Sequence, residues 1–179
     1  MNQFTSNFWK RLAALFLVGS FLVLSGCATS PKTAFYSFNA DGGNDKWVET
    51  VELLDGRFGT EKLTFWDVPR SYVGTKYVSQ GAGIGGQYPI PETLYVKWRI
   101  RATGEVLEKT VSFKGILPKD LNKQAITFLF EGKQLFVYLV TDKFTPKDLP
   151  KTITRTWLSK YNTSYEIYPT NQLPKALQE

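Results

Sequence analysis

Residues 93–101 read Thr-Leu-Tyr-Val-Lys-Trp-Arg-Ile-Arg, and this stretch decides the fold. Its apolar side chains stand at every second position: Leu94, Val96, Trp98 and Ile100. Polar or cationic residues alternate with them. Because successive side chains of a strand point to opposite faces, this period of two predicts a β-strand with one face toward a core and one toward solvent.

Two hairpins extend the pattern along the chain. A turn at residues 102–104 leads from the first strand to a partner strand over 106–113, which makes the first hairpin. The second hairpin is expected from strands over 126–130 and 135–141, joined by Glu131-Gly132-Lys133. Both faces of its second strand are apolar, which indicates a central strand that is covered on two sides.

Further strands are expected where β-branched and aromatic residues lie between turn residues. These candidate strands are residues 34–39, 47–54, 62–67, 71–79 and 164–168. Residues 118–122 are expected to form one helical turn with proline at its start, and the tail 169–179 is expected to be loose. The sequence therefore predicts a mainly β protein, an antiparallel β-sandwich with minor helix, whose globular domain covers residues 34–168.

A signal peptide is expected over residues 1–26. Lys10 and Arg11 precede an apolar run, Leu12–Leu24, and small residues separate this run from the single cysteine, Cys27. The run has about 13 residues, fewer than the roughly 20 that a membrane-spanning helix needs. These features favour a secretory signal over a plain membrane helix.

The residues Leu24-Ser25-Gly26-Cys27 resemble the lipobox of bacterial lipoproteins. The resemblance implies cleavage between Gly26 and Cys27, diacylglycerol on the Cys27 thiol and a short tether over residues 27–33. Ala28, the residue after the cysteine, resembles the outer-membrane class. We therefore expect a lipid-anchored protein of the cell envelope that faces the periplasm. The alternative is a secreted protein with a chance cysteine.

Composition argues against the common catalytic classes. The 179-residue chain has no histidine, which excludes Ser-His-Asp catalysis and His-ligated zinc. Acylation of Cys27 would also leave no free thiol. Carboxylate, lysine, tyrosine and Ser-Lys chemistry remain open. We expect a binding protein rather than an enzyme, without a cofactor or a metal. Asp41–Asp45 is expected to form a plain turn, because its spacing does not match a calcium-binding EF-hand loop.

Charge bounds the partners. The net charge is +6 for the full chain, and it would be +4 after removal of residues 1–26, which contain Lys10 and Arg11 and no acid. This mildly basic balance suits contact with anionic lipid headgroups or with an acidic partner, and it is also ordinary for a periplasmic protein. A nucleic-acid partner is not expected outside the cytoplasm.

A glycine-rich stretch precedes the decisive strand. Gly81–Gly86 matches the spacing of a dinucleotide-binding turn, but Gln87–Pro91 follows it and cannot open the helix that such a turn requires. We therefore expect residues 81–91 to form an adaptable surface loop mounted on the strand at Thr93. The alternative is a disordered connection without a role.

This loop and a cationic row beside it are the predicted partner-binding surface. The row consists of Lys97, Arg99 and Arg101 at every second position, and Lys109 is expected across the hairpin from it. A solvated sheet face, balanced by Glu105 and Glu108, is the alternative. The predicted binding residues are Gly83, Gly85, Gly86, Tyr88, Ile90, Lys97, Arg99 and Arg101.

A family resemblance adds a functional expectation. The stretch Pro89–Arg99, the Gly104-Glu105 turn, the strand at Lys109–Val111 and Leu117-Pro118 are similar to a group of small proteobacterial lipoproteins. The similarity covers roughly residues 34–141. Some members of the group are encoded beside type VI secretion lipase effectors and act as periplasmic immunity proteins. The resemblance implies a protein that binds and neutralises a secreted phospholipase toxin and catalyses nothing.

Two other functions stay open. A structural or envelope-assembly lipoprotein would brace a larger machine through strand or loop contacts. A carbohydrate-binding lipoprotein would use tryptophan and tyrosine platforms together with carboxylates, so an exposed aromatic groove flanked by carboxylates would favour it.

Replacing Cys27 with Ser tests the anchor. Without the thiol no diacylglycerol can be attached, so the Cys27→Ser chain should accumulate as an uncleaved or mislocalised precursor. Membrane fractionation and intact-mass analysis measure this. A variant that is processed and fractionates with membranes as the parent does would contradict the anchor assignment.

Overall fold

The computed structural model describes residues 32–69, 74–143 and 150–178, which fold mainly into β-strands. In chain order the elements are β1 (Thr33–Asp41), the 3-10 helix η1 (Trp47–Glu49), β2 (Val51–Phe58), β3 (Glu61–Lys62), β4 (Thr64–Val68), β5 (Ser79–Pro89), β6 (Thr93–Ile100), β7 (Val106–Ser112), β8 (Ala125–Glu131), β9 (Gln134–Thr141), β10 (Thr163–Tyr168) and α3 (Lys175–Gln178).

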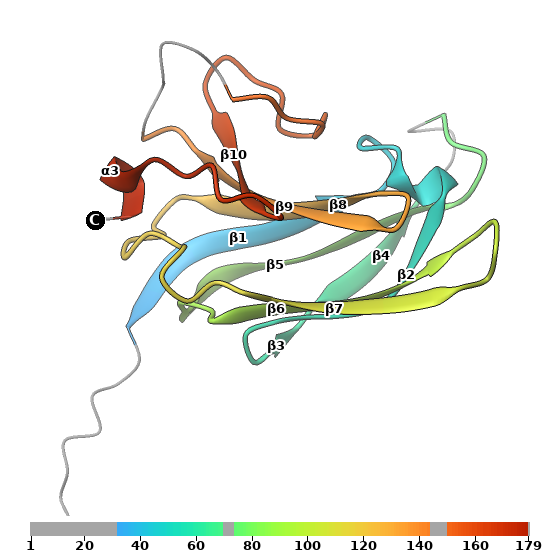
Figure 1. Ribbon diagram of the computed structural model, residues 1–179, viewed down its shortest axis with the longest axis horizontal. Helices are drawn as coiled ribbons and strands as arrows, with labels where there is room; N and C mark the ends of the chain where they lie inside the picture. The colour runs from blue at the N-terminus through green and yellow to red at the C-terminus, as the bar shows by residue number, and fades with distance from the viewer. Residues whose placement is uncertain (1–31, 70–73, 144–149, 179) are drawn as a thin grey trace, which may run out of the picture. The chain divides into compact units, whose positions relative to one another are not determined.

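Two sheets pack face to face (Figure 1). Sheet A has six strands in the order β10-β9-β8-β1-β5-β4, and sheet B has four in the order β3-β2-β6-β7. All pairings are antiparallel except that of β1 with β8, where Ser37 lies opposite Ala125. The predicted fold class, a mainly β antiparallel sandwich with minor helix, is confirmed.

The decisive strand is β6, at the centre of sheet B. It pairs with β2 on one side and β7 on the other. Leu94, Val96 and Trp98 on its inner face are at most 3% exposed, as the period of two predicts. The first hairpin, β6–β7, and the second hairpin, β8–β9, both form as predicted.

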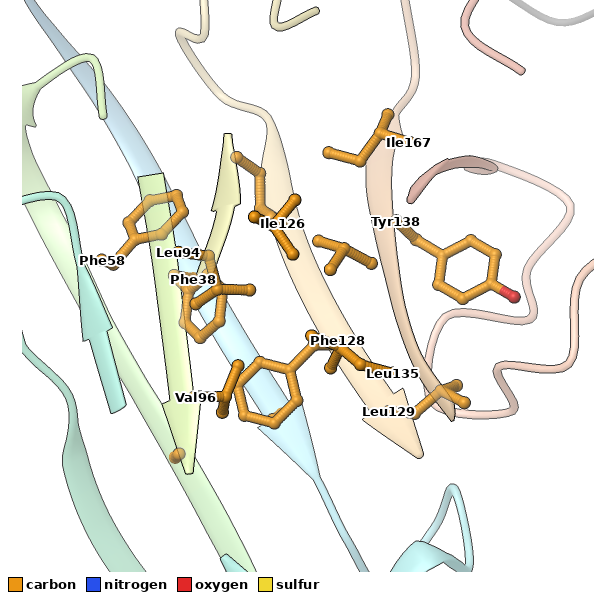
Figure 2. Packing of buried hydrophobic residues seen from close by; sticks show 14 of the residues in the cluster. Phe38, Phe58, Leu94, Val96, Ile126, Phe128, Leu129, Leu135, Tyr138 and Ile167 are labelled. Carbon is orange, nitrogen blue, oxygen red and sulfur yellow. The ribbon is translucent and has the colours of Figure 1, made fainter. Parts of the chain in front are cut away.

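Aromatic rings from both sheets meet in the core. The ring centroid of Phe38 in β1 lies 4.6 Å from that of Phe58 in β2 and 5.4 Å from that of Phe128 in β8. Nearer the other end, the rings of Trp98 and Phe130 lie 4.9 Å apart. Figure 2 shows Phe38, Phe58 and Phe128 converging between the sheets. Large rings bury much apolar area each, so they dominate the stability of such a core.

Sheet A is also covered on its outer face over β8, β9 and β10. Tyr138 of β9 and Leu129 of β8 point away from sheet B (Figure 2), yet they are only 1% and 2% exposed. Burial raises the pKa of Tyr138, and Thr152 and Ile153 in the segment before β10 lie beside its hydroxyl. This covering segment (residues 150–162) explains why both faces of β9 are apolar, as predicted.

The predicted glycine loop is wrong: residues 79–89 form strand β5, between β1 and β4 in sheet A. Glycine is required at Gly81 and Gly83 because neighbouring atoms occupy the space of a side chain, not because the chain must be flexible there. A Cβ at Gly81 would lie 2.3 Å from Nε1 of Trp66, and one at Gly83 would lie 2.5 Å from the carbonyl oxygen of Phe38. Glycine within a strand is typical of such close contacts.

Several other boundaries differ from expectation. Residues 47–54 divide into η1 and the start of β2, because the chain turns into sheet B at Thr50. Residues 62–67 divide into β3 and β4 at Leu63, where the chain passes from one sheet to the other. Residues 74–78 and 118–122 form turns and bends instead of a strand and a helical turn, and residues 70–73 lie outside the described part.

The predicted loose tail is held against the domain. The Leu173 side chain is 6% exposed and belongs to the core cluster. The backbone N–H of Gln172 donates to the carbonyl oxygen of Glu166 at 2.8 Å, and α3 follows. Leu177 is partly buried against the same core. Polar residues precede Leu173, and Lys175 stands between the two leucines, so the tail shows no continuous apolar run. None of the described helices is long and apolar enough to cross a membrane.

Two glycine substitutions in β5 test this pairing. Gly83→Ala should lower the free energy of unfolding by about 1–3 kcal/mol, the usual cost of overpacking, because the Phe38 carbonyl oxygen is backbone of the neighbouring strand. Gly85→Ala is the matched control, since a Cβ there meets nothing within 4 Å. It should be neutral or stabilising by about 0.4–1 kcal/mol. Urea unfolding measures both, and equal stability of the two variants would contradict the described β1–β5 register.

Candidate functional site

The structure separates the predicted binding residues between the two sheets. Gly83, Gly85 and Gly86 lie in β5 of sheet A, whereas Lys97 and Arg99 lie in β6 of sheet B. The premise of one protruding loop beside a cationic row is therefore wrong. Sequence reasoning joined them because they are near neighbours along the chain, but the turn at Ile90 carries the chain from one sheet to the other.

Tyr88 and Ile90 are partly buried at the end of β5. The Tyr88 ring centroid lies 6.2 Å from that of Tyr36, and both side chains pack against the core. The Tyr36 hydroxyl donates to the carbonyl oxygen of Pro89 at 2.8 Å. Burial, together with the negative charge of Glu61, raises the pKa of Tyr36 to about 12. Tyr88 is thus part of a packed aromatic pair, not a free anchor.

The residues of the cationic row have partners or acidic neighbours on adjacent strands and turns. Arg99 forms an ion pair with Glu52 of β2 at 2.8 Å, and Lys97 lies between Asp55 and Glu108 in the strand register. The Nε of Arg101 donates to the carbonyl oxygens of Val48 and Val51. These partners, far apart in the sequence, give the mixed-charge solvated face that was the alternative interpretation.

Tyr95 and Lys109, also in the first hairpin, do not add to a free cationic surface. The Tyr95 hydroxyl donates to Glu108 at 2.8 Å, and this hydrogen bond raises the pKa of Tyr95. Lys109 lies opposite Val96 in the register, so it projects from the inner face of edge strand β7. Its ammonium nitrogen lies 5.9 Å from the ring centroid of Tyr168 in β10. Lys109 therefore does not extend the row as expected.

An uncovered face of sheet A is the better candidate site. We call it the glycine face: the outward surface of Ser37 and Asn39 in β1, Gly81, Gly83 and Gly85 in β5, and Trp66 in β4. Trp66 packs against the bare backbone of Gly81 and Gly83 and remains 43% exposed. Phe35, at the other end of β1 on the same face, is 62% exposed. Large aromatic side chains exposed in this way mark interaction surfaces.

The two exposed aromatics bound a floor of small residues. Phe35 lies opposite Gln87 in β5 and Trp66 lies opposite Gly81, six residues along the same strand. At a rise of about 3.3 Å per residue, the two rings are anchored roughly 20 Å apart. The floor between them presents only short side chains, which leaves space for a partner's side chains between the two rings.

A groove runs beside this face, between β1 and the covering segment. It has a volume of about 330 Å³. Its lining includes Phe35, Ser37, Lys123, Asp142, Trp157 and Asn162. Lys123 adopts a positive φ of 61°, a conformation that is strained for a residue with a side chain. Its backbone N–H donates to the carbonyl oxygen of Phe35 at 2.8 Å, which fixes the floor of the groove.

Asp45 holds the covering segment that walls this groove. Its carboxylate accepts hydrogen bonds from the hydroxyl of Thr154 at 3.1 Å, and from the backbone N–H and the hydroxyl of Thr156 at 2.9 and 2.7 Å. It also accepts from the backbone N–H of Arg155. Asp41 caps its own turn through Gly43 and Asn44. The described residues contain no cluster of three or more acids, cysteines or histidines that could hold a metal.

The glycine face escaped sequence analysis for a physical reason. The sequence does contain the period of two that is typical of a β-strand, because Gly81, Gly83 and Gly85 stand at every second position. A glycine has no side chain to mark it as apolar or polar, so the period of two in this stretch resembles a flexible loop. The exposed ring of Trp66 and the docked β1 strand are what make the stretch a strand.

Removing the Asp45 carboxylate should release the covering segment. Asp45→Ala is expected to lower the free energy of unfolding by about 2 kcal/mol, since hydrogen bonds to a charged group contribute about 1.5–3 kcal/mol. The amides of Arg155 and Thr156 should exchange faster with solvent. Asp67→Ala, at an exposed acid of β4, is the matched control and should change neither. Unchanged exchange at residues 155 and 156 in the Asp45 variant would show that other contacts hold the segment.

Comparisons with protein-family models, with curated proteins and with solved structures find no match to the chain. The similarity to type VI secretion immunity lipoproteins therefore stays a prediction. The fold and the glycine face are the two observations from which a function can be argued.

Proposed function

We propose that this chain is a lipid-anchored protein of the bacterial envelope, facing the periplasm, and that it binds and neutralises a secreted phospholipase toxin. The observation that carries the binding role is the exposure of Phe35 and Trp66 at opposite ends of the glycine face. The signal sequence and the residues around Cys27 support the anchor and the compartment.

The glycine face has the composition of a protein-binding surface. Tryptophan and other aromatic side chains contribute most of the binding energy at many interfaces, and truncating one often costs about 2 kcal/mol or more. Trp66 is held by packing against Gly81 and Gly83, so little side-chain freedom would be lost when a partner covers it. The short floor between Trp66 and Phe35 would accept a protruding segment of the partner.

The proposed lipid anchor and the proposed phospholipase toxin would both be located at the membrane. A phospholipase acts on membrane lipids, and a lipid-anchored inhibitor is concentrated on that membrane. Tethering raises the effective concentration of the two proteins for each other without any new contact. This supports a toxin that attacks the membrane over one that acts elsewhere in the periplasm.

A carbohydrate-binding function is the second candidate, and one observation favours it. The groove beside β1 brings the aromatic side chains of Phe35 and Trp157 together with the carboxylate of Asp142. Aromatic rings that stack on sugar rings, with carboxylates that accept hydroxyl hydrogen bonds, are the elements such a site needs. Here the ligand would be an envelope saccharide rather than a protein.

A protection assay separates the two functions. Cells that direct a phospholipase effector from the same genome to their periplasm should survive when the full chain is co-expressed. The Trp66→Ala and Phe35→Ser variants should each weaken binding to the purified effector at least tenfold. Tyr95→Ala, an aromatic truncation on the outer face of sheet B, is the control and should bind as the parent does.

Two results would contradict the toxin-binding proposal. One is full protection by both glycine-face variants at normal protein levels. The other is failure of the parent to bind any phospholipase effector while it binds peptidoglycan fragments in a manner that Trp157→Ala abolishes, which would establish the saccharide function instead.

A further inference from the structure

The domain is held close to its proposed lipid anchor. Four residues separate Cys27 from Lys32, which makes five Cα-to-Cα steps, and β1 begins at Thr33. A fully extended chain spans at most about 3.5 Å per residue, so Lys32 lies within roughly 18 Å of the anchored cysteine. The backbone N–H of Ile90 donates to the carbonyl oxygen of Lys32 at 3.3 Å, which ties this point to the turn after β5.

Three segments surround the point where the chain enters β1. They are the β2–β3 turn at residues 59–60, the β5–β6 turn at 90–92 and the segment 113–119 that follows β7. Two hollows of about 310 and 370 Å³ lie on either side of the β5–β6 turn, and both are lined by Ile90, Pro91 and Glu92. We call these segments, with Lys32 and Pro89, the tether-end surface; in Figure 1 the start of β1 marks this end of the sandwich.

The tether-end surface combines apolar and cationic side chains. Pro89 is exposed, and Ile90, Ile116 and Leu117 are partly buried, so each keeps some apolar surface toward solvent. Three exposed lysines accompany them: Lys32, Lys114 and Lys119. Within residues 32–69, 74–143 and 150–178, none of these lysines forms an ion pair.

Among the described residues, acidic side chains without an ion-pair partner are fewer than the exposed lysines at this end. Glu61 and Glu92 line the hollows beside the β5–β6 turn. Asp120, next to Lys119, is paired with Lys143 at 2.8 Å. Lys114 and Lys119 therefore have a single acid close to them in the sequence of segment 113–120, Asp120, and it has its own partner. Lysines beside apolar side chains are the combination that binds an anionic bilayer surface, where the cations meet phosphates and the apolar groups enter the interface.

We propose that the tether-end surface rests on the membrane, with Lys114 and Lys119 against anionic phospholipid headgroups and Ile90 and Leu117 at the headgroup boundary. The proposal depends on the lipid anchor of the proposed function and adds an orientation to it. β1 and β5 then lead away from the bilayer, so that Phe35 is the end of the glycine face nearer the membrane and Trp66 is the farther end. A membrane-bound toxin would meet the glycine face from the side.

Site-specific quenching in vesicles tests this orientation. The lipidated full chain is reconstituted in vesicles of phosphatidylethanolamine and phosphatidylglycerol. Acylation blocks Cys27, so an introduced cysteine is the single free thiol. A fluorophore is attached at Thr60→Cys in the β2–β3 turn or at Thr103→Cys in the turn between β6 and β7, at the opposite end. Lipids that carry a spin label on the headgroup should quench the label at 60 at least threefold more than the label at 103.

A charge-reversal pair identifies the contact. Lys114→Glu with Lys119→Glu should bring quenching at 60 close to the level at 103. Lys76→Glu with Lys160→Glu makes the same change in net charge at two exposed lysines elsewhere and should leave the contrast intact. Circular dichroism confirms that both variants are folded.

Two outcomes overturn the proposal. Equal quenching at 60 and 103 in protein that floats with the vesicles shows a domain that turns freely on its tether, and it leaves the anchor and the toxin-binding function standing. A contrast that survives the reversal of Lys114 and Lys119 shows that these lysines do not make the contact. Protein without a lipid mass that fails to float with vesicles overturns the anchor and this orientation together, which distinguishes that failure from the other two.

Discussion

The bare backbone of β5 is the constraint on which the rest of sheet A depends. A Cβ at Gly83 would lie 2.5 Å from the carbonyl oxygen of Phe38, and one at Gly81 would overlap Trp66. Because these positions have no side chains, the whole of β1 can pair with residues 81–89 of β5 and carry Phe38 into the centre of the core. The same absence leaves a flat outer surface, on which Trp66 lies at the edge and stays partly exposed.

The cations of β6 have partners within sheet B, so the candidate site lies on sheet A. Arg99 of β6 forms an ion pair with Glu52 of β2, and Lys97 lies opposite Asp55 and Glu108 in the strand register. At the edge between β7 and β10, Lys109 reaches the ring of Tyr168, and a charged side chain that points inward at a sheet edge discourages pairing with other chains. Over β8–β10 the covering segment shields the outer face of sheet A. The glycine face is an uncovered part of that sheet among the described residues, and it holds the exposed rings of Phe35 and Trp66.

Much of the fold was predictable, because the pattern of apolar side chains along a strand shows which of its faces are buried. An alternating pattern indicates one buried face, and a continuous apolar run indicates two. β6 and β7 follow from the alternation around Trp98, and β8 and β9 follow from apolar runs that separate at Gly132. The glycine stretch was not predictable, since what makes it a strand lies elsewhere in the sequence: Phe38, 45 residues before Gly83, and Trp66. The candidate site failed for the same reason. The cations were identified correctly by type, but their partners on β2 become visible only in the sheet register.

Native-state hydrogen exchange of the β5 amides tests the central claim, that the glycine stretch is an inner strand of sheet A and builds the glycine face. The amides of Gly81, Ala82 and Gly83 lie between β1 and β4, so they should be as protected as the amide of Val96 in β6. Exchange as fast as that of Gly104, in the turn between β6 and β7, would show a flexible loop and would remove the surface on which the proposed function depends.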